Sequence, residues 1–135
     1  MLASARADYP TVRILRARRA RRSARSYLAG APAEVAILQC HRDQVLSLPP
    51  GADRLGSSPR CENELWAIGD HVLAIQGHPE MVYETLEAIM DARPRLIDAE
   101  ARERCAASLA SYPPPDPRAS DVAAVCRRFL SGGPD

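Results

Sequence analysis

The sequence predicts a small α/β domain, and three observations lead to this fold class. Its 135 residues have room for one domain of ordinary size. Short apolar runs of strand length occupy the middle of the chain, and after Pro79 apolar residues recur with the 3.6-residue period of helices. Hydrophobic residues make up 46% of the chain, a fraction typical of proteins that fold around a core.

Strands are expected in the middle of the chain. Residues 34–40 (EVAILQC) form an apolar run that predicts a buried strand. Residues 47–58 are rich in Pro, Gly and Ser and predict a loop. Residues 64–68 and 71–76 predict two strands of a hairpin, joined by the two residues Gly69 and Asp70. The second of these strands is apolar on both faces, so we expect both faces to be covered.

Three helices are expected after Pro79. The first carries Val82, Leu86, Ile89 and Met90 on one face and ends near residue 92, because Pro94 follows. The second is predicted over residues 94–109, and residues 112–117 (YPPPDP) form a rigid break. The last helix begins at residue 120 and ends near residue 132, with residues 122, 125 and 129 facing the core.

The charge of the chain changes near residue 33. Residues 1–33 hold eight arginines and one acid, whereas residues 34–135 hold ten arginines and sixteen acids. We predict a largely disordered basic extension over 1–33, although residues 14, 17, 20, 24 and 28 recur at near-helical spacing. An organellar transit peptide and a nucleic-acid-binding arm share this composition and remain open alternatives. Because no aromatic residue interleaves the arginine run, nucleic acid is the less favoured partner.

The absence of targeting signals and the spacing of the cysteines indicate the cellular compartment of the protein. No apolar stretch approaches the roughly 18 residues of a membrane-spanning helix, so no membrane partner is expected. No secretory signal follows the first charges, and the four cysteines form no C-x-x-C pair. We therefore predict a cytoplasmic protein with reduced thiols, or an organellar one if residues 1–33 act as a transit peptide.

The clearest candidate site is formed by His78 and Glu80, at the end of the second hairpin strand. Strand ends in α/β sheets are places where reactive side chains project into a crevice. An imidazole beside a carboxylate can take a proton from a thiol while the carboxylate orients the ring. From spacing alone, a histidine before a turn is more often structural or merely exposed.

Several motifs in order carry a resemblance to a known family. They are residues 40–45 (CHRDQV), 48–52 (LPPGA), 57–58 (SS), 68–73 (IGDHVL) and 75–80 (IQGHPE). Together they resemble the C-terminal half of a class I glutamine amidotransferase domain, in particular that of plant and algal gamma-glutamyl peptidases. The resemblance covers residues 34–132, where two closing helices and a proline-containing break fall in the expected order, and leaves 133–135 as a tail.

The resemblance implies a fold, a reaction and roles for residues. The fold is a flavodoxin-like α/β sandwich around a mainly parallel sheet, here with an incomplete sheet and the C-terminal helices. In the reaction, a cysteine attacks a gamma-glutamyl amide or peptide bond of a small substrate such as glutamine or a glutathione-like molecule. No cofactor or metal is implied. His78 matches the general base, Glu80 the acid that orients it, and residues 41–43 a loop at the rim of the site.

The sequence departs from the family at the nucleophile. In the family this cysteine lies on a strained turn, G-x-C-x-G, in the half that precedes these motifs. The four cysteines here read QCH, RCE, RCA and VCR, so none has that setting. Cys40 corresponds to the strand that leads to the rim loop and is not assigned as nucleophile. Cys61 is expected in a loop, and Cys105 and Cys126 on helix faces.

Three functions follow from these observations. The first is a fragment of a gamma-glutamyl peptidase-like hydrolase that keeps a remnant of the catalytic triad and is inactive alone. In the second, a complementing N-terminal half supplies the cysteine. The third is a non-catalytic binding module whose basic arm serves targeting or nucleic-acid binding. The incomplete sheet is expected to leave an unpaired edge, so the isolated chain is predicted to be marginally stable.

Overall fold

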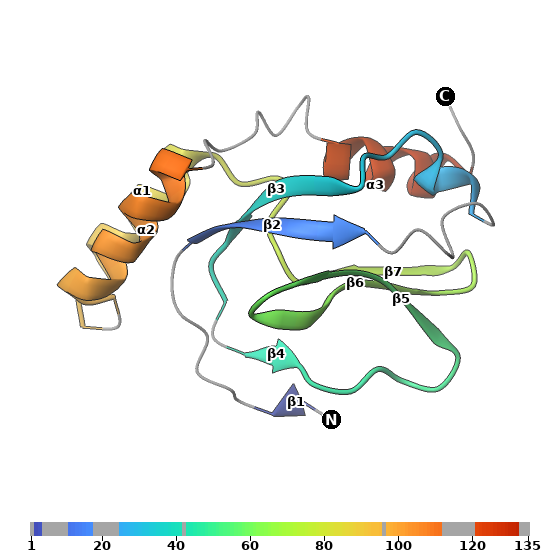
Figure 1. The fold of residues 1–135 in the computed structure, drawn as a ribbon, viewed down its shortest axis with the longest axis horizontal. Helices are drawn as coiled ribbons and strands as arrows, with labels where there is room; N and C mark the ends of the chain where they lie inside the picture. Colours follow the sequence, from blue (N-terminus) through green and yellow to red (C-terminus); the bar gives the residue numbers. More distant parts are fainter. Residues whose placement is uncertain are drawn as a thin grey trace.

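The computed structural model describes residues 2–3, 11–17, 25–41, 43–95, 97–111 and 121–132, the first two segments by their backbone only. Its main element is a five-stranded sheet with strand order β3-β2-β5-β6-β7 (Figure 1). The strands are β2 (Thr11–Ala17), β3 (Glu34–Gln39), β5 (Ala52–Ser58), β6 (Cys61–Ile68) and β7 (Val72–Ile75). Two short strands, β1 (Leu2–Ala3) and β4 (Gln44–Val45), pair separately.

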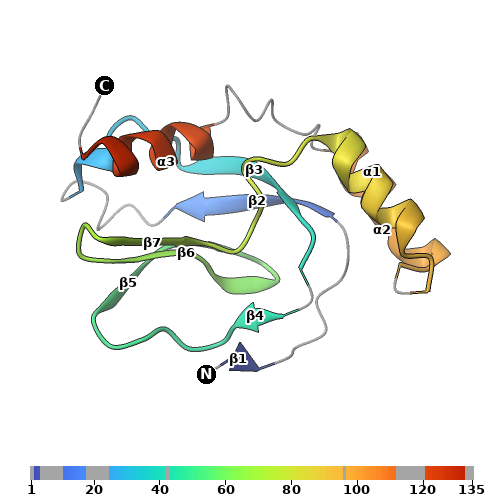
Figure 2. The same ribbon diagram turned by 180° about the vertical axis from the view of Figure 1, so that it is seen from behind.

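Helices accompany the sheet at two places. The 3-10 helix η2 (Ser26–Leu28) and α3 (Asp121–Ser131) lie together over β3, whereas α1 (Tyr83–Ala92) and α2 (Ala99–Ser111) form a pair at the other end of the molecule (Figures 1 and 2). Arg102 of α2 joins that pair, because its guanidinium donates to Asp91 Oδ1 over 2.9 Å and to the carbonyl of Met90 over 2.5 Å. The predicted α/β fold class with C-terminal helices is thus confirmed.

All pairings among the described strands are antiparallel, which differs from the mainly parallel sheet that the resemblance implies. The connections explain the difference. Two residues separate β5 from β6, and three separate β6 from β7. Connections this short can join only antiparallel neighbours, since a parallel pair needs a crossover of about a dozen residues. This segment is therefore a meander of hairpins.

The two ends of the strand order meet at His78. Its backbone N–H donates to the carbonyl of Leu38 over 2.9 Å, and the two residues form an isolated antiparallel bridge. Leu38 belongs to β3, the first strand in the order, while His78 follows β7, the last. The chain after β7 therefore returns to β3, and the sheet curls around the interior that it encloses.

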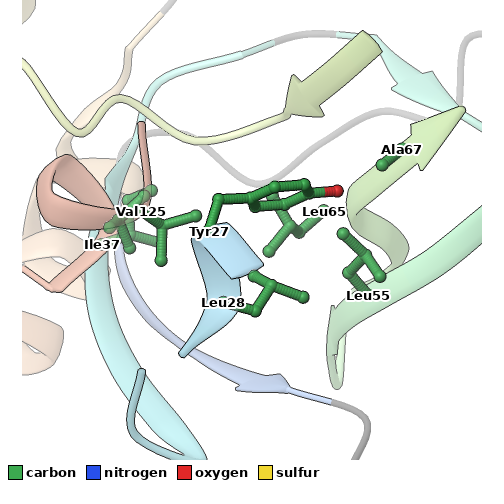
Figure 3. Close-up of a cluster of buried hydrophobic side chains, with 8 residues drawn as sticks. Tyr27, Leu28, Ile37, Leu55, Leu65, Ala67 and Val125 are labelled. Atoms are coloured by element: carbon green, nitrogen blue, oxygen red, sulfur yellow. The ribbon is translucent and has the colours of Figure 1, made fainter. Parts of the chain in front are cut away.

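Two hydrophobic clusters pack against the sheet. Neighbouring residues of a strand point to opposite faces, and accordingly Ile37 belongs to one cluster and Leu38 to the other. In the first cluster, Tyr27 and Leu28 of η2 lie between side chains of β3 and α3 on one side and of β5 and β6 on the other (Figure 3). The second cluster joins Leu38 to the apolar faces of α1 and α2.

The predicted disorder of residues 1–33 is wrong where the structure describes this segment. Residues 11–17 form β2, which pairs with β3 and β5. Tyr27 and Leu28 are buried, and Arg25 binds Asp53 over 2.8 Å and also contacts the carbonyl of Gly69. Partners distant in sequence supply this order, so the local basic composition did not indicate it. The other residues of the segment lie outside the described ranges.

Two further predictions in the middle of the chain are corrected. Residues 52–58, expected in a loop, form β5, because pairing with β6 and β2 compensates for their weak strand propensity. The connection between β6 and β7 has three residues rather than two, with Gly69 at a φ of +52° that favours glycine. The strand predicted over 34–40 is confirmed as β3. Val72 of β7 is 37% exposed, so that strand is not covered on both faces.

The helices agree largely with the sequence. α1 ends at Ala92 as predicted and buries Leu86 and Met90. α2 begins at Ala99 rather than at residue 94, because the Asp98 side chain caps it by accepting the Ala101 N–H over 2.8 Å. α3 buries Val122 and Val125, whereas residues 112–117 and 120 lie outside the described ranges. Among the helices of the described ranges, none is long and apolar enough to cross a membrane.

Candidate catalytic base and its support

The structure brings the two predicted site residues into contact. His78 Nδ1 lies 2.9 Å from Glu80 Oε1, with 34% of the His78 side chain and 69% of the Glu80 side chain exposed. A carboxylate at this position accepts the Nδ1 proton, which fixes the ring orientation and leaves Nε2 as the basic nitrogen. The contact has the arrangement expected of a base beside an orienting acid, and both side chains are partly exposed; the catalytic roles stay predictions.

The backbone around His78 is fixed by successive hydrogen bonds. The Gln76 N–H donates to the carbonyl of Glu64 over 2.8 Å, and the His78 N–H donates to the carbonyl of Leu38. The carbonyl of His78 in turn accepts the Met81 N–H over 3.3 Å, which closes a turn containing Pro79. These bonds bring the chain from β7 to α1 in a defined path, with His78 and Glu80 on the turn between them.

The predicted rim segment lies beside this strand end. The Gln76 side chain bridges to it, because its Nε2 donates to the carbonyl of Asp43 over 3.2 Å and its Oε1 accepts the Val45 N–H over 3.4 Å. The amide of Asn63 donates to the carbonyl of Val45 over 2.8 Å. His41 Nδ1 contacts the carbonyl of Asp43 over 3.1 Å. The structure thus places Asp43 and Val45 beside the strand end that leads to His78, while a structural or substrate-rim role of His41 stays a prediction.

Behind the site lies a buried polar network that sequence reasoning missed. Glu64 of β6 is fully buried, and its two carboxylate oxygens accept from Gln39 Nε2 over 3.0 Å and from Ser58 Oγ over 2.6 Å. Ser58 Oγ also accepts the Cys61 N–H over 3.1 Å. The one signal in the sequence is the polar run of Glu62, Asn63 and Glu64 in the first half of β6, a pattern that favours solvent exposure rather than burial.

None of the four cysteines forms a disulfide bond, and burial raises the pKa of three of them. Burial raises the pKa of Cys40, with a smaller opposing effect from Arg93. Burial also raises the pKa of Cys105 and of Cys126, and the Glu80 carboxylate raises that of Cys126 further. Cys61, expected in a loop, is instead a buried residue at the start of β6. A nucleophilic cysteine needs the opposite shift, toward the thiolate.

Other features of the described residues stand apart from His78. An open pocket is lined by residues 44–46 and 57–62, which do not include His78 or Glu80. Within the described ranges no group of three or more His, Cys, Asp or Glu residues is arranged to hold a metal ion.

Solved structures define the class of fold. A glutamine amido transferase from Methylobacillus flagellatus superposes with a TM-score of 0.70 at 17% identity, covering 98% of this chain and 55% of that one. A glutamine amidotransferase from Thermotoga maritima gives a TM-score of 0.63 at 16% identity, covering 89% of this chain and 50% of that one. The described fold is thus that of part of a class I glutamine amidotransferase domain. No family model matches the sequence.

Sequence relatives are more specific. Gamma-glutamyl peptidase 2 of Arabidopsis thaliana is 35% identical over 100 residues, which are 73% of this chain and 39% of the relative. Gamma-glutamyl peptidase 3 of the same plant is 37% identical over 103 residues, 75% of this chain and 40% of the relative. The chain is a homologue of the gamma-glutamyl peptidases and spans about 40% of their length, which confirms the resemblance found in its motifs.

Proposed function

We propose that this chain supplies the general base, His78, and the orienting acid, Glu80, for the cleavage of gamma-glutamyl amide or peptide bonds by a cysteine. The observation that carries the proposal is the 2.9 Å contact between His78 Nδ1 and Glu80 Oε1 on a half-exposed turn. The names of the relatives, gamma-glutamyl peptidases, supply the class of substrate. Glutamine and glutathione-like molecules belong to that class.

The chemistry assigns one task to each group. His78 Nε2 accepts the proton of the thiol, and the thiolate attacks the gamma-carbonyl of the substrate. The imidazolium then protonates the leaving ammonia or amine as the carbon–nitrogen bond breaks, which leaves a thioester. His78 next takes a proton from water, whose oxygen attacks the thioester and releases the gamma-carboxylate and the thiol. Throughout, Glu80 holds the ring and stabilises its cationic form.

We propose further that the nucleophile is none of the four cysteines of this chain. Cys61 and Cys105 are buried, and the raised pKa values of Cys40, Cys105 and Cys126 disfavour the thiolate. No cysteine stands in the G-x-C-x-G setting of the family. The partner that completes the site is then a polypeptide carrying that turn, and the chain alone forms no acyl-enzyme.

The basic N-terminal segment is proposed to stay with the folded protein. β2 lies between β3 and β5, so removal of residues 1–33 as a transit peptide would take a strand out of the sheet. The same pairing is difficult to combine with a free nucleic-acid-binding arm. We accordingly propose a cytoplasmic protein and no nucleic-acid partner.

Reconstitution tests the proposed function. The full chain is mixed with a separately produced segment of a gamma-glutamyl peptidase that carries the G-x-C-x-G turn, and glutamate release from a gamma-glutamyl peptide is measured. We expect a rate well above that of either part alone, and a drop of about 10²–10⁴-fold with His78→Ala, as for the loss of a general base. Leu130→Ala, at an 83% exposed position of α3, is the matched control. A mixture no faster than its parts contradicts the proposal.

A further inference from the structure

We infer that Gln39 and Glu64 are positioning residues for His78. The buried hydrogen bond between their side chains fixes the backbone of residues 76–78, and this backbone determines where the imidazole lies. This inference rests on the proposed role of His78 as a base. Neither side chain touches the imidazole in any contact described above, so any effect on the reaction passes through the backbone of residues 76–78. Three contacts, one for each of these residues, carry the argument.

The first contact ties Glu64 to Gln76. The carbonyl of Glu64 accepts the Gln76 N–H over 2.8 Å, while the carboxylate of the same residue accepts from Gln39 and Ser58. A fully buried carboxylate is tolerated only when its hydrogen bonds are made. The burial of Glu64 therefore fixes its own side chain and those of its donors, Gln39 and Ser58. The backbone of Gln76 is held as well, because its N–H donates to the carbonyl of Glu64.

The second contact is a close approach of Gln39 to Gly77. A Cβ atom at Gly77 would lie 2.7 Å from Gln39 Nε2 and 2.7 Å from Ile37 Cδ1. Such distances are below any van der Waals contact, so the backbone of Gly77 rests directly on these two side chains. Because Gln39 Nε2 donates to Glu64 Oε2 over 3.0 Å, the carboxylate determines where this supporting amide lies.

The third contact is made by the backbone of β3. Gln39 directly follows Leu38, whose carbonyl accepts the His78 N–H over 2.9 Å. The amide of Gln39 and the carbonyl of Leu38 therefore support adjacent residues, Gly77 and His78. If the Gln39 side chain lost Glu64, its amide would leave the position that supports Gly77. The end of β3 and the turn would then adjust together, and the 2.9 Å contact between His78 and Glu80 would be lost.

The test is the protonation of the His78 ring, read from its ¹⁵N resonances in the full chain. Wild type is expected to hold the proton of the neutral ring on Nδ1, facing Glu80. Gln39→Leu keeps the bulk of the side chain but removes the donor, and we expect loss of this single form in favour of a mixture of tautomers. Glu64→Gln is the milder variant, with a partial loss, and decides the matter if Gln39→Leu does not fold.

Two controls separate positioning from general destabilisation. Val122→Ala removes buried side-chain volume from α3 in the first cluster and is expected to lower stability without changing the ring nitrogens. Glu80→Gln removes the carboxylate itself and is expected to show the full loss. Wild-type ring resonances in folded Gln39→Leu or Glu64→Gln overturn the inference. An inactive reconstituted mixture would count against the proposed function alone, because this readout needs no turnover.

Discussion

Two glutamates that contact the segment around His78, Glu64 through Gln76 and Glu80 through the imidazole, differ in burial and in hydrogen bonding. Glu64 is fully buried and bound by two side-chain donors, whereas the side chain of Glu80 is 69% exposed and contacts the imidazole. The buried carboxylate lies among strands and is inferred to support the backbone, while the exposed one faces solvent and is proposed to orient the ring. The comparison separates the support of the site from its chemistry.

The difference also has an energetic side. Removing a buried carboxylate leaves its hydrogen-bond donors without an acceptor in the interior. Each unsatisfied donor lowers the stability of the folded protein. An exposed ion pair between His78 and Glu80 is screened by water and adds little to folding. Substitution of Glu64 should therefore change the stability of the protein. Substitution of Glu80 should change the chemistry of His78 with little effect on stability.

The largest effect is expected from removing the buried carboxylate. Glu64→Ala leaves Gln39 and Ser58 without their acceptor and should lower the free energy of unfolding by about 2–6 kcal/mol, at about 1–3 kcal/mol for each donor group. The matched control, Glu80→Ala, should stay within about 0.5 kcal/mol of wild type, as most exposed positions do. Urea unfolding followed by circular dichroism measures both. Equal losses for the two variants would remove the distinction between support and chemistry.

A smaller effect is expected where the support touches the turn. Gly77→Ala places a methyl group against Gln39 and Ile37 and should cost about 1–3 kcal/mol by overpacking. Gly30→Ala is the control, because its φ of +71° is unfavourable for alanine but nothing lies within 4 Å of the new atom, giving a loss of about 1–2 kcal/mol. Of the two, only Gly77→Ala should alter the ring nitrogens of His78. A Gly77→Ala chain with wild-type stability and spectrum would show that the close approach is unimportant.

The smallest expected effect concerns the thiols. Because burial raises the pKa of Cys40 and of Cys126, each holds less thiolate at pH 7.5 than an exposed cysteine. Alkylation by iodoacetamide should therefore be slower than for a small free thiol, and should accelerate as the pH rises toward 10. Peptide mass spectrometry gives the rate at each site, with the urea-unfolded chain as reference. A cysteine that reacts faster than the small thiol at pH 7.5 would be an activated nucleophile.

The sequence predicted the elements that local patterns determine. The apolar run at β3, the helical period of α1 and the burial of Val122 and Val125 all follow from spacing within a single segment. The pairing of His78 with Glu80 was predicted from a six-residue stretch of chain, residues 75–80. β2 and β5 were missed because their basic or Ser-rich residues become strands only through pairing with partners elsewhere in the chain.

The support of the site was beyond sequence reasoning for a related reason. Gln39 and Glu64 are far apart in the chain, and glutamine and glutamate are residue types that are usually exposed to solvent. Their burial depends on the curl of the sheet, which the bridge between Leu38 and His78 completes. The glycine at position 77 was part of a recognised motif, but the reason for it, contact with Gln39 and Ile37, needs the fold.

The central claim is that this chain holds a base and its orienting acid without a thiol that they activate. The most direct measurement is the intact mass of the purified full chain after incubation with a chloroketone analogue of glutamine at neutral pH. The account predicts no glutamine-protectable adduct, and only the slow, distributed labelling of unactivated cysteines. Rapid attachment of a single label to one cysteine, blocked by excess glutamine, would contradict it.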